Sequence, residues 1–278
     1  MYNNNPLFIN SKKLLEWVCF DKIDWEYLSD NENPNAIHLL EENLEKVNWH
    51  FLSRNPNAIH LLEKNLEKVD WHWLSENPNA IHILEENKDK IVWPFLAANT
   101  NAIHILEATL EKVDWYWLSI NPSAIHLIEK NFDRIGWEHL SENPNAIHIL
   151  EANTDKIHWN SLAKNPNAIH ILEANPDKIN WNSLSLNSNA IHILEANPDK
   201  INWNSLSLNS NAIHILEKNQ DKINWGLFCR NPSIFQKVIN YEFLKERMDV
   251  IREELIMKCM RPTRLERWLE MGGDIDDF

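Results

Sequence analysis

Glycine and cysteine are scarce in this 278-residue chain, which has four glycines and three cysteines. So few glycines leave little material for the tight turns of a β protein, and no stretch alternates apolar and polar residues with a period of two. Cys19, Cys229 and Cys259 are odd in number and far apart, so a secreted disulfide framework is not expected. The sequence therefore favours helices and a reducing compartment.

Positive charge and long apolar runs are also lacking. The chain has 27 Lys and Arg against 41 Asp and Glu, for a formal net charge of −14. Binding to a phosphate backbone needs a stripe of basic residues, so nucleic acid is excluded as the expected partner. No apolar run approaches the roughly 18 residues of a membrane span, and the start MYNNNPLFINSKK does not read as a secretory signal. We expect a soluble, intracellular protein with no membrane partner.

A 22-residue repeat dominates what is present. Its template is N-P-N-A-I-H-[IL]-[LI]-E-x-N-x-[DE]-[KR]-[IV]-x-W-x-x-L-S-x, and a fixed period of this size is typical of a solenoid. We divide the chain into an N-terminal cap with a degenerate half repeat (1–32), nine repeats (33–230), and a degenerate repeat with a C-terminal helical cap (231–278). The nine units begin at Asn33, Asn55, Asn77, Asn99, Asn121, Asn143, Asn165, Asn187 and Asn209.

Each unit reads as two short helices. Asn33 suits an N-cap, Pro34 suits the first helical position, and Asn43 suits a left-handed helix end. A capping residue such as Asn48 or Asp70 also precedes the repeat tryptophan. The predicted fold is all-α: an α-solenoid of αα-hairpin repeats with N- and C-terminal capping helices. With helices packed about 8 to 10 Å apart, nine units predict a rod or arc of about 80 to 90 Å.

One histidine recurs in every unit. On a helical wheel Ala36, Ile37, Leu39 and Leu40 form the apolar side, and His38 falls opposite them, with a glutamate three residues later in all nine units. We consider three interpretations. Each imidazole bonds a helix-end carbonyl or a glutamate of its own or the next unit, or the column is a pH-responsive or partner-contacting strip, or it binds metal. Metal is disfavoured because zinc needs four ligands around one ion.

The tryptophan column, from Trp49 to Trp225, is predicted to lie in the core, and acid–lysine pairs such as Glu45-Lys46 are predicted to form solvated turns. The column two residues after the tryptophan changes character. It is aromatic in the early units, histidine at His139, and then Ser161, Ser183 and Ser205. Rings that the template does not require suggest a binding ridge; the alternative is a wider groove that the rings simply fill. The candidate partner-binding residues are Tyr27, Phe51, Trp73, Phe95 and Trp117, with His50, His72 and Tyr116 one position earlier.

The ends differ from the template. After Asn240 the pattern suits longer amphipathic capping helices, the last opened by Pro262. The units NPNAIHILEANPDKINWNSLS and the closing RPTRLERWLEMGGDIDDF resemble the Asn-rich short-repeat proteins encoded by giant DNA viruses of amoebae and algae. The resemblance implies a viral product in the cytoplasm of the infected cell. The family pattern has histidine before the proline of the closing motif, where this chain has Arg261.

No catalytic or cofactor motif is recognisable in the sequence. It contains no Gly-rich phosphate loop, no G-x-S-x-G, no H-E-x-x-H and no Cys-x-x-Cys. Equivalent His and Glu copies along one edge supply no enclosed pocket. We therefore expect a noncatalytic repeat scaffold that binds another protein, without cofactor or metal. A structural role in the virion is the main alternative, and an acidic decoy for a basic protein surface is a third.

Overall fold

The computed structural model describes residues 8–9, 13–236, 238–239, 245 and 248. Residues Lys12–Gln236 form one compact unit, and Met1–Ser11 with Lys237–Phe278 form another. In the smaller unit, β1 (Phe8–Ile9) pairs antiparallel with β2 (Val238–Ile239). The capping helices expected after Asn240, including the one opened by Pro262, lie outside the described residues.

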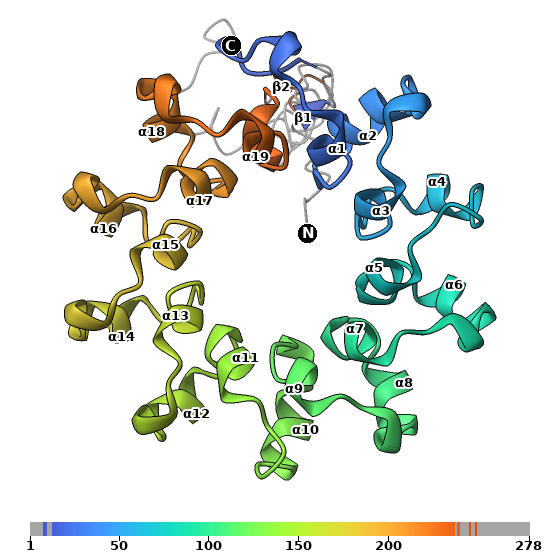
Figure 1. Ribbon diagram of the computed structural model, residues 1–278, viewed down its shortest axis with the longest axis vertical. Helices are drawn as coiled ribbons and strands as arrows, with labels where there is room; N and C mark the ends of the chain where they lie inside the picture. Colours follow the sequence, from blue (N-terminus) through green and yellow to red (C-terminus); the bar gives the residue numbers. More distant parts are fainter. Residues whose placement is uncertain (1–7, 10–12, 237, 240–244, 246–247, 249–278) are drawn as a thin grey trace, which may run out of the picture. The chain divides into compact units, whose positions relative to one another are not determined.

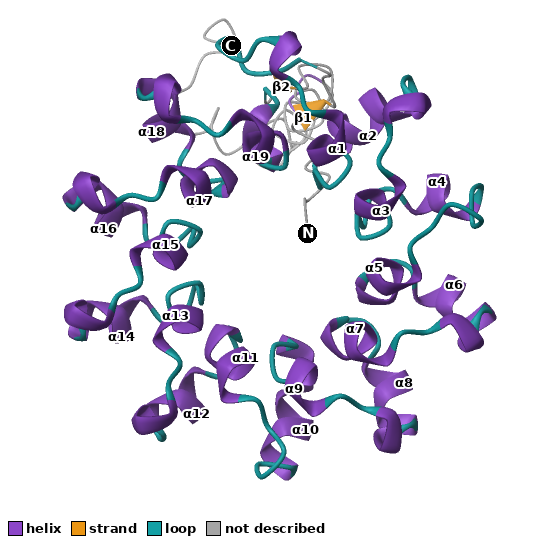
Figure 2. Ribbon diagram, in the orientation of Figure 1, coloured by secondary structure: helices purple, strands orange, loops and turns teal. Residues whose placement is uncertain are grey.

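The larger unit alternates two kinds of short α-helix, which confirms the all-α solenoid of two-helix repeats (Figures 1 and 2). The tryptophan helices are α1 (Trp25–Leu28), α3 (Trp49–Leu52), α5 (Trp71–Glu76), α7 (Trp93–Ala98), α9 (Trp115–Leu118), α11 (Trp137–Glu142), α13 (Trp159–Leu162), α15 (Trp181–Leu184), α17 (Trp203–Leu208) and α19 (Trp225–Cys229). The histidine helices are α2 (Pro34–Glu41), α4 (Ile59–Glu63), α6 (Ile81–Glu86), α8 (Ile103–Ala108), α10 (Ile125–Lys130), α12 (Ile147–Glu151), α14 (Ile169–Ala174), α16 (Ile191–Ala196) and α18 (Ile213–Lys218). In Figure 1 the tryptophan helices of this unit form its inner row and the histidine helices its outer row.

Short 3-10 turns complete most units, a third element that the sequence pattern did not predict. They are η1 (Phe20–Lys22), η2 (Leu44–Lys46), η3 (Lys88–Lys90), η4 (Leu110–Lys112), η5 (Pro122–Ala124), η6 (Thr154–Lys156), η7 (Pro176–Lys178), η8 (Pro198–Lys200), η9 (Gln220–Lys222) and η10 (Pro232–Ile234). The longest helix described, α2, has eight residues, so none of the helices in the described part of the chain could traverse a bilayer.

Side-chain caps explain why the helices begin and end where they do. Asn48 and Asp70 accept hydrogen bonds from backbone N–H groups of the tryptophan helices that follow them, as predicted. Asn33 caps α2, with Pro34 at its first position. Asn43 is not left-handed: its φ is −139°, and its Nδ2 instead donates to the Leu39 carbonyl at 2.9 Å. A side-chain amide thus satisfies a carbonyl that the helix end leaves free.

Leucine and alanine, rather than tryptophan, form the fully buried core. Side chains such as Leu52, Leu74 and Ala80 are 0% exposed. The repeat tryptophans pack against this core but are mostly half-buried, which corrects the expectation of a tryptophan core. In nine cases a Lys or Arg of the next unit's acid–basic pair lies over the indole, with the cation 4.4–4.9 Å from the ring centroid. The basic residue of each solvated turn therefore covers the outer face of the preceding repeat's ring.

A buried asparagine column links every unit to the one before it. Asn143 Nδ2 donates to the carbonyls of Ser119 at 2.9 Å and Asn121 at 3.0 Å, and its Oδ1 accepts from the Asn145 N–H at 2.9 Å. Both amide hydrogens and the amide oxygen are thus bonded in a site with 0% exposure. The same two donations are made by Asn31, Asn55, Asn77, Asn99, Asn121, Asn143, Asn165, Asn187, Asn209 and Asn231.

The column begins at Asn31, not at Asn33 as alignment on Asn-Pro suggests. Asn55 Nδ2 donates to the Asn31 carbonyl at 2.8 Å, and Asn31 Nδ2 donates to the carbonyls of Cys229 at 2.7 Å and Asn231 at 3.0 Å. The last repeat therefore packs against the first in the way that each interior repeat packs against the one after it. The array of residues 13–236 is closed. The expectation of an open rod or arc is wrong for these residues: the first and last repeats cover each other.

The closing contacts repeat those between interior units. In seven interior pairs of units a serine hydroxyl, for example that of Ser53, accepts from the N–H of the next unit's helix cap; at the closure Cys229 Sγ accepts from the Asp24 N–H at 3.2 Å. Lys22 lies 4.4 Å from the Trp225 ring centroid. Burial raises the pKa of the Cys229 thiol to about 11, so the thiol stays protonated and can donate to the Lys22 carbonyl. The Asp30 carboxylate, 4% exposed, pairs with both Arg54 and Arg230.

Asn143→Ala should lower the free energy of unfolding by about 3 kcal/mol, because three hydrogen bonds are lost in a buried site. The control is Asn145→Ala, whose exposed side chain gives up a single bond to the Pro122 carbonyl and should cost about 1 kcal/mol. Urea unfolding followed by circular dichroism measures both. Equal losses would show that the buried column has no special role.

Asp30→Ala should open the closure by leaving Arg54 and Arg230 unpaired. Hydrogen exchange should then accelerate together in α1 and α19, about 200 residues apart in the chain, while α9 keeps its protection. Glu142→Ala is the matched control, because Glu142 occupies the same repeat position and pairs with Lys164 far from the closure in sequence. Unchanged exchange in α19 after Asp30→Ala would contradict a closure held by this ion-pair cluster.

Candidate functional site: an aromatic ridge on the inner helices

The recurring histidines are exposed and bridge successive units. Eight of them place Nε2 2.7–3.1 Å from a glutamate Oε1 of the preceding unit, as in His60–Glu41 and His214–Glu195. These imidazoles are 46–59% exposed. His38 instead bonds Glu41 of its own unit, and the hydrogen bond from His60 is the main reason that the pKa of Glu41 is lowered. The partner is thus the preceding unit's glutamate rather than the next unit's, and the geometry favours the stacking interpretation.

Metal binding has no support in this column. Each imidazole meets one carboxylate, and no group of three or more His, Cys, Asp or Glu side chains in the described residues is arranged to hold a metal ion. Exposed pairs of this kind contribute roughly 0 to 1 kcal/mol each, so the column acts through repetition rather than through any single strong bond.

The aromatic candidates form one continuous set of ring contacts, here called the aromatic ridge: Tyr27, His50, Phe51, His72, Trp73, Phe95, Tyr116 and Trp117. Tyr27 stacks on Phe51 with ring centroids 6.0 Å apart, and Phe95 stacks on Trp117 at 6.1 Å. Between these pairs, His50 contacts Phe51 and Trp73, while Phe95 contacts Trp73 and His72, all at 5.4–5.6 Å. All eight predicted residues therefore lie together on α1, α3, α5, α7 and α9. His139 on α11 extends the ridge.

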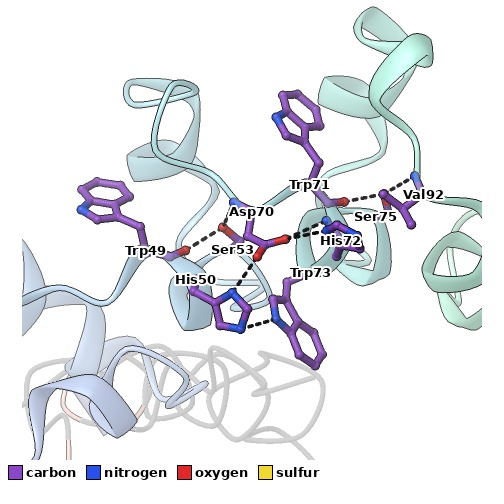
Figure 3. Close-up of polar contacts among 9 residues, drawn as sticks. All are labelled: Trp49, His50, Ser53, Asp70, Trp71, His72, Trp73, Ser75 and Val92. Carbon is purple, nitrogen blue, oxygen red and sulfur yellow. Dashed lines mark hydrogen bonds and ion pairs between the residues drawn. The ribbon is translucent and has the colours of Figure 1, made fainter.

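A polar relay fixes the middle of the ridge (Figure 3). Trp73 Nε1 donates to His50 Nε2 at 2.7 Å, and His50 Nδ1 lies 2.6 Å from Asp70 Oδ2. Because the indole is only a donor, His50 Nε2 must be the unprotonated nitrogen and Nδ1 must carry the hydrogen that Asp70 accepts. Burial acts to raise the pKa of Asp70, but hydrogen bonds from His50 and from the His72 N–H outweigh it, and the pKa is lowered. In the His50–Asp70 pair, Trp73 occupies the second nitrogen of His50, so His50 is not available as a general base in this geometry.

Among the Tyr, Phe and Trp side chains of the ridge, the exposed ones lie at its far end, where Tyr116 is 44% and Trp117 is 37% exposed. Tyr116 OH donates to Glu138 at 2.7 Å, which raises the pKa of Tyr116 and lowers that of Glu138. Gly136 makes this arrangement possible, because a Cβ there would lie 2.6 Å from Tyr116 Cδ2. The buried His139 Nε2 has no hydrogen-bond partner among the residues that the structure describes. This end of the ridge presents aromatic surface beside an acidic group.

The later inner helices replace the rings with small polar groups. Asn180 Nδ2 donates to Asn160 Oδ1 at 2.9 Å, and the same contact recurs from Asn202 to Asn182 and from Asn224 to Asn204. The neighbouring Ser161, Ser183 and Ser205 occupy the ridge position. The backbone of the repeat therefore accepts either an aromatic ring or a serine at this position.

Two functional features escaped sequence reasoning. The first is the buried hydrogen bonding of the Asn that begins each unit, which the sequence explained as an N-cap alone. The sequence did offer an indication of a second role, because Asn is kept at Asn187 and Asn209, where proline does not follow. The other is Arg54, whose guanidinium lies 4.8 Å from the Trp73 ring centroid. Arg54 occupies a column of mixed residues, so no pattern singled it out.

Burial lowers the pKa of His139, and the positive charge of Lys164 lowers it further. The negative charges of Glu138, Glu142 and Asp114 act to raise this pKa but do not outweigh burial. The unfolded chain therefore binds the proton more readily than the folded one, and stability should fall as pH drops below about 6.5. His139→Ser and His139→Asn should each flatten the dependence of unfolding free energy on pH between about 5 and 7, by up to one proton. Urea titrations at several pH values measure this slope; a slope identical to that of the original chain would refute the assignment.

Comparison with known proteins adds no evidence on function to that of the side chains described above. No family model, curated protein or solved structure matches the chain. The resemblance to giant-virus repeat proteins stays a prediction. What the described residues establish is an all-α repeat array whose inner helices carry the aromatic ridge on one stretch and asparagine and serine on the next.

Proposed function

We propose that the protein is a noncatalytic repeat scaffold and that its aromatic ridge binds another protein. The observation that carries the proposal is the change of side chains at one repeat position: rings from Tyr27 to Trp117, serines from Ser161 to Ser205, on the same backbone. Rings that the fold does not need, and that remain partly exposed, are typical of binding surfaces.

The surroundings of the ridge suit recognition. Ring-to-ring contacts and the Trp73–His50–Asp70 relay hold the side chains before any partner arrives, so little rotamer freedom remains to be lost on binding. The closed array of residues 13–236 supports the helices that carry the ridge. A rigid aromatic surface on a rigid support gives affinity at a low entropic cost.

The cellular setting remains a prediction. The giant-virus family implies action in the cytoplasm of the infected cell, with a structural place in the virion as the alternative. Quantitative mass spectrometry of purified particles and of infected-cell lysate separates the two, because a virion component is abundant in the particles.

The triple variant Phe51→Ser, Trp73→Ser and Trp117→Ser tests the proposal by installing the residue that the later repeats already carry. It should stay folded, because the buried asparagine and leucine columns are intact, while losing roughly 0.5 to 1.5 kcal/mol for each aromatic pair removed. An affinity pull-down from infected-cell lysate should recover a partner with the original chain and not with this variant.

The matched control is Asn160→Ser, Asn182→Ser and Asn204→Ser on the polar stretch of the inner helices, which should retain the partner. Circular dichroism and thermal melting establish that all three proteins are folded. Equal recovery by the original chain and the ridge variant would place the binding surface elsewhere. A collapse of the fold in the ridge variant would show that the rings serve packing.

A further inference from the structure

A three-residue arrangement on the early inner helices holds a guanidinium. Arg54 donates from Nε to Asp30 Oδ1 at 3.1 Å and from an Nη to Asp30 Oδ2 at 2.5 Å, and its guanidinium carbon lies 4.8 Å from the Trp73 ring centroid. The carboxylate comes from the end of the α1 segment, the arginine from that of α3, and the ring from α5. Three successive inner helices thus supply an acid, a cation and an aromatic ring.

The repeat places an equivalent set two units further along. Moving each of Asp30, Arg54 and Trp73 by two units, with the longer first unit taken into account, gives Glu76 on α5 as the acid, Ala98 on α7 as the cation position and Trp117 on α9 as the ring. Acid and ring are both present, but alanine stands where the arginine would be. Glu76 is half-buried and makes no hydrogen bond or ion pair among the described residues, although the charge of Arg54 reaches it.

A third set shows that the acid and cation pair without a ring. Glu142 on α11 and Lys164, directly after α13, form an ion pair of 3.1 Å, and the ring position there is Ser183. Beside Asp30 and beside Glu142 the protein therefore supplies the cation from its own chain. It leaves this position unfilled at the exposed end of the aromatic ridge, where Trp117, flanked by Phe95 and His139, is 37% exposed.

We infer that Glu76, Ala98 and Trp117 form a binding site for an arginine side chain of a protein partner, in the place that Arg54 takes between Asp30 and Trp73. The inference rests on the proposed function, because Trp117 belongs to the aromatic ridge. It names the chemistry of the partner: a basic segment that presents arginine.

Arginine fits this site better than lysine does. A guanidinium is planar and weakly hydrated, so one group can lie against an indole and also donate two parallel hydrogen bonds to a carboxylate, as Arg54 does with Asp30. An ammonium is a strongly hydrated point charge that lacks this geometry. Asp114 accepts from the Trp117 N–H and Glu138 accepts from the hydroxyl of the neighbouring Tyr116, so both add negative charge to this end of the ridge. The net charge of −14 attracts a basic segment from a distance.

Binding of a blocked tetra-arginine peptide, with tetra-lysine as the comparison, tests the inference by calorimetry at about 0.15 M salt, where long-range attraction is screened. Tetra-arginine should bind more tightly than tetra-lysine. Glu76→Gln should weaken it about tenfold by removing a charged hydrogen-bond acceptor, and Trp117→Ser about threefold by removing the ring.

Ala98→Arg is the decisive variant. Its own guanidinium should fill the site, lower the affinity for tetra-arginine at least about tenfold, and raise the melting temperature. The matched control is Leu208→Arg, which adds the same charge at the same repeat position between Leu186 and Leu227, where neither acid nor ring is available. Leu208→Arg should not raise the melting temperature, and it should change the affinity for tetra-arginine by no more than about twofold.

Three results would overturn the inference: the original chain does not bind tetra-arginine, it binds tetra-arginine and tetra-lysine equally well, or Ala98→Arg binds tetra-arginine as tightly as the original chain does. The partner pull-down separates this failure from that of the proposed function. A partner lost by the triple ridge variant but retained by Ala98→Arg would leave the ridge as a protein-binding surface that does not act through arginine.

Discussion

The buried asparagine column is the interaction on which the rest of the structure depends. Each of its amides makes two donations to the preceding unit and one acceptance within its own, so the distance and the angle between units are fixed by hydrogen bonds rather than by apolar contact alone. An amide without hydrogen bonds in a site of 0% exposure would destabilise the fold more than an apolar residue there would. Only the arrangement of units that satisfies every amide is therefore stable. Leucine and alanine then fill the space that this geometry defines.

The other columns follow from that constraint. With units set at a constant spacing, any residue type repeated every 22 positions meets its own kind or its fixed complement in the neighbouring unit. Serine meets the backbone of the next cap, lysine meets the preceding indole, and histidine meets the preceding glutamate. The same rule turns early aromatic residues into a ridge and later asparagines into a hydrogen-bonded row. The inner helices therefore carry two chemically distinct stretches on one framework.

Much of this was accessible from sequence because it is local. Helix caps such as Asp70, the polar placement of His38 and the set of ridge residues follow from spacing along one helix or along one column. The closure of the array could not be predicted from the sequence. A single 22-residue template does not specify the small rotation between neighbouring units, and the closure depends on the sum of these rotations. Asn31 shows the difficulty: its role depends on Cys229 and Asn231, about 200 residues away, and a two-residue insertion disguises its alignment. The partial burial of the tryptophans was missed because the lysine or arginine that covers a ring comes from the following unit.

Closure also changes how stability is distributed among the repeats. In an open array each terminal unit has one interface, so unfolding begins at an end and proceeds inward at the cost of one interface per step. In the array of residues 13–236 every unit has two neighbours, and the first opening breaks a contact without releasing any unit. Fraying from an end is replaced by a single nucleation step. The same geometry fixes the number of units: an open solenoid gains or loses a copy freely, whereas a closed one must change its curvature to admit another. This holds even though two consecutive 22-residue stretches, Asn175–Ala196 and Asn197–Lys218, differ only at their last residue.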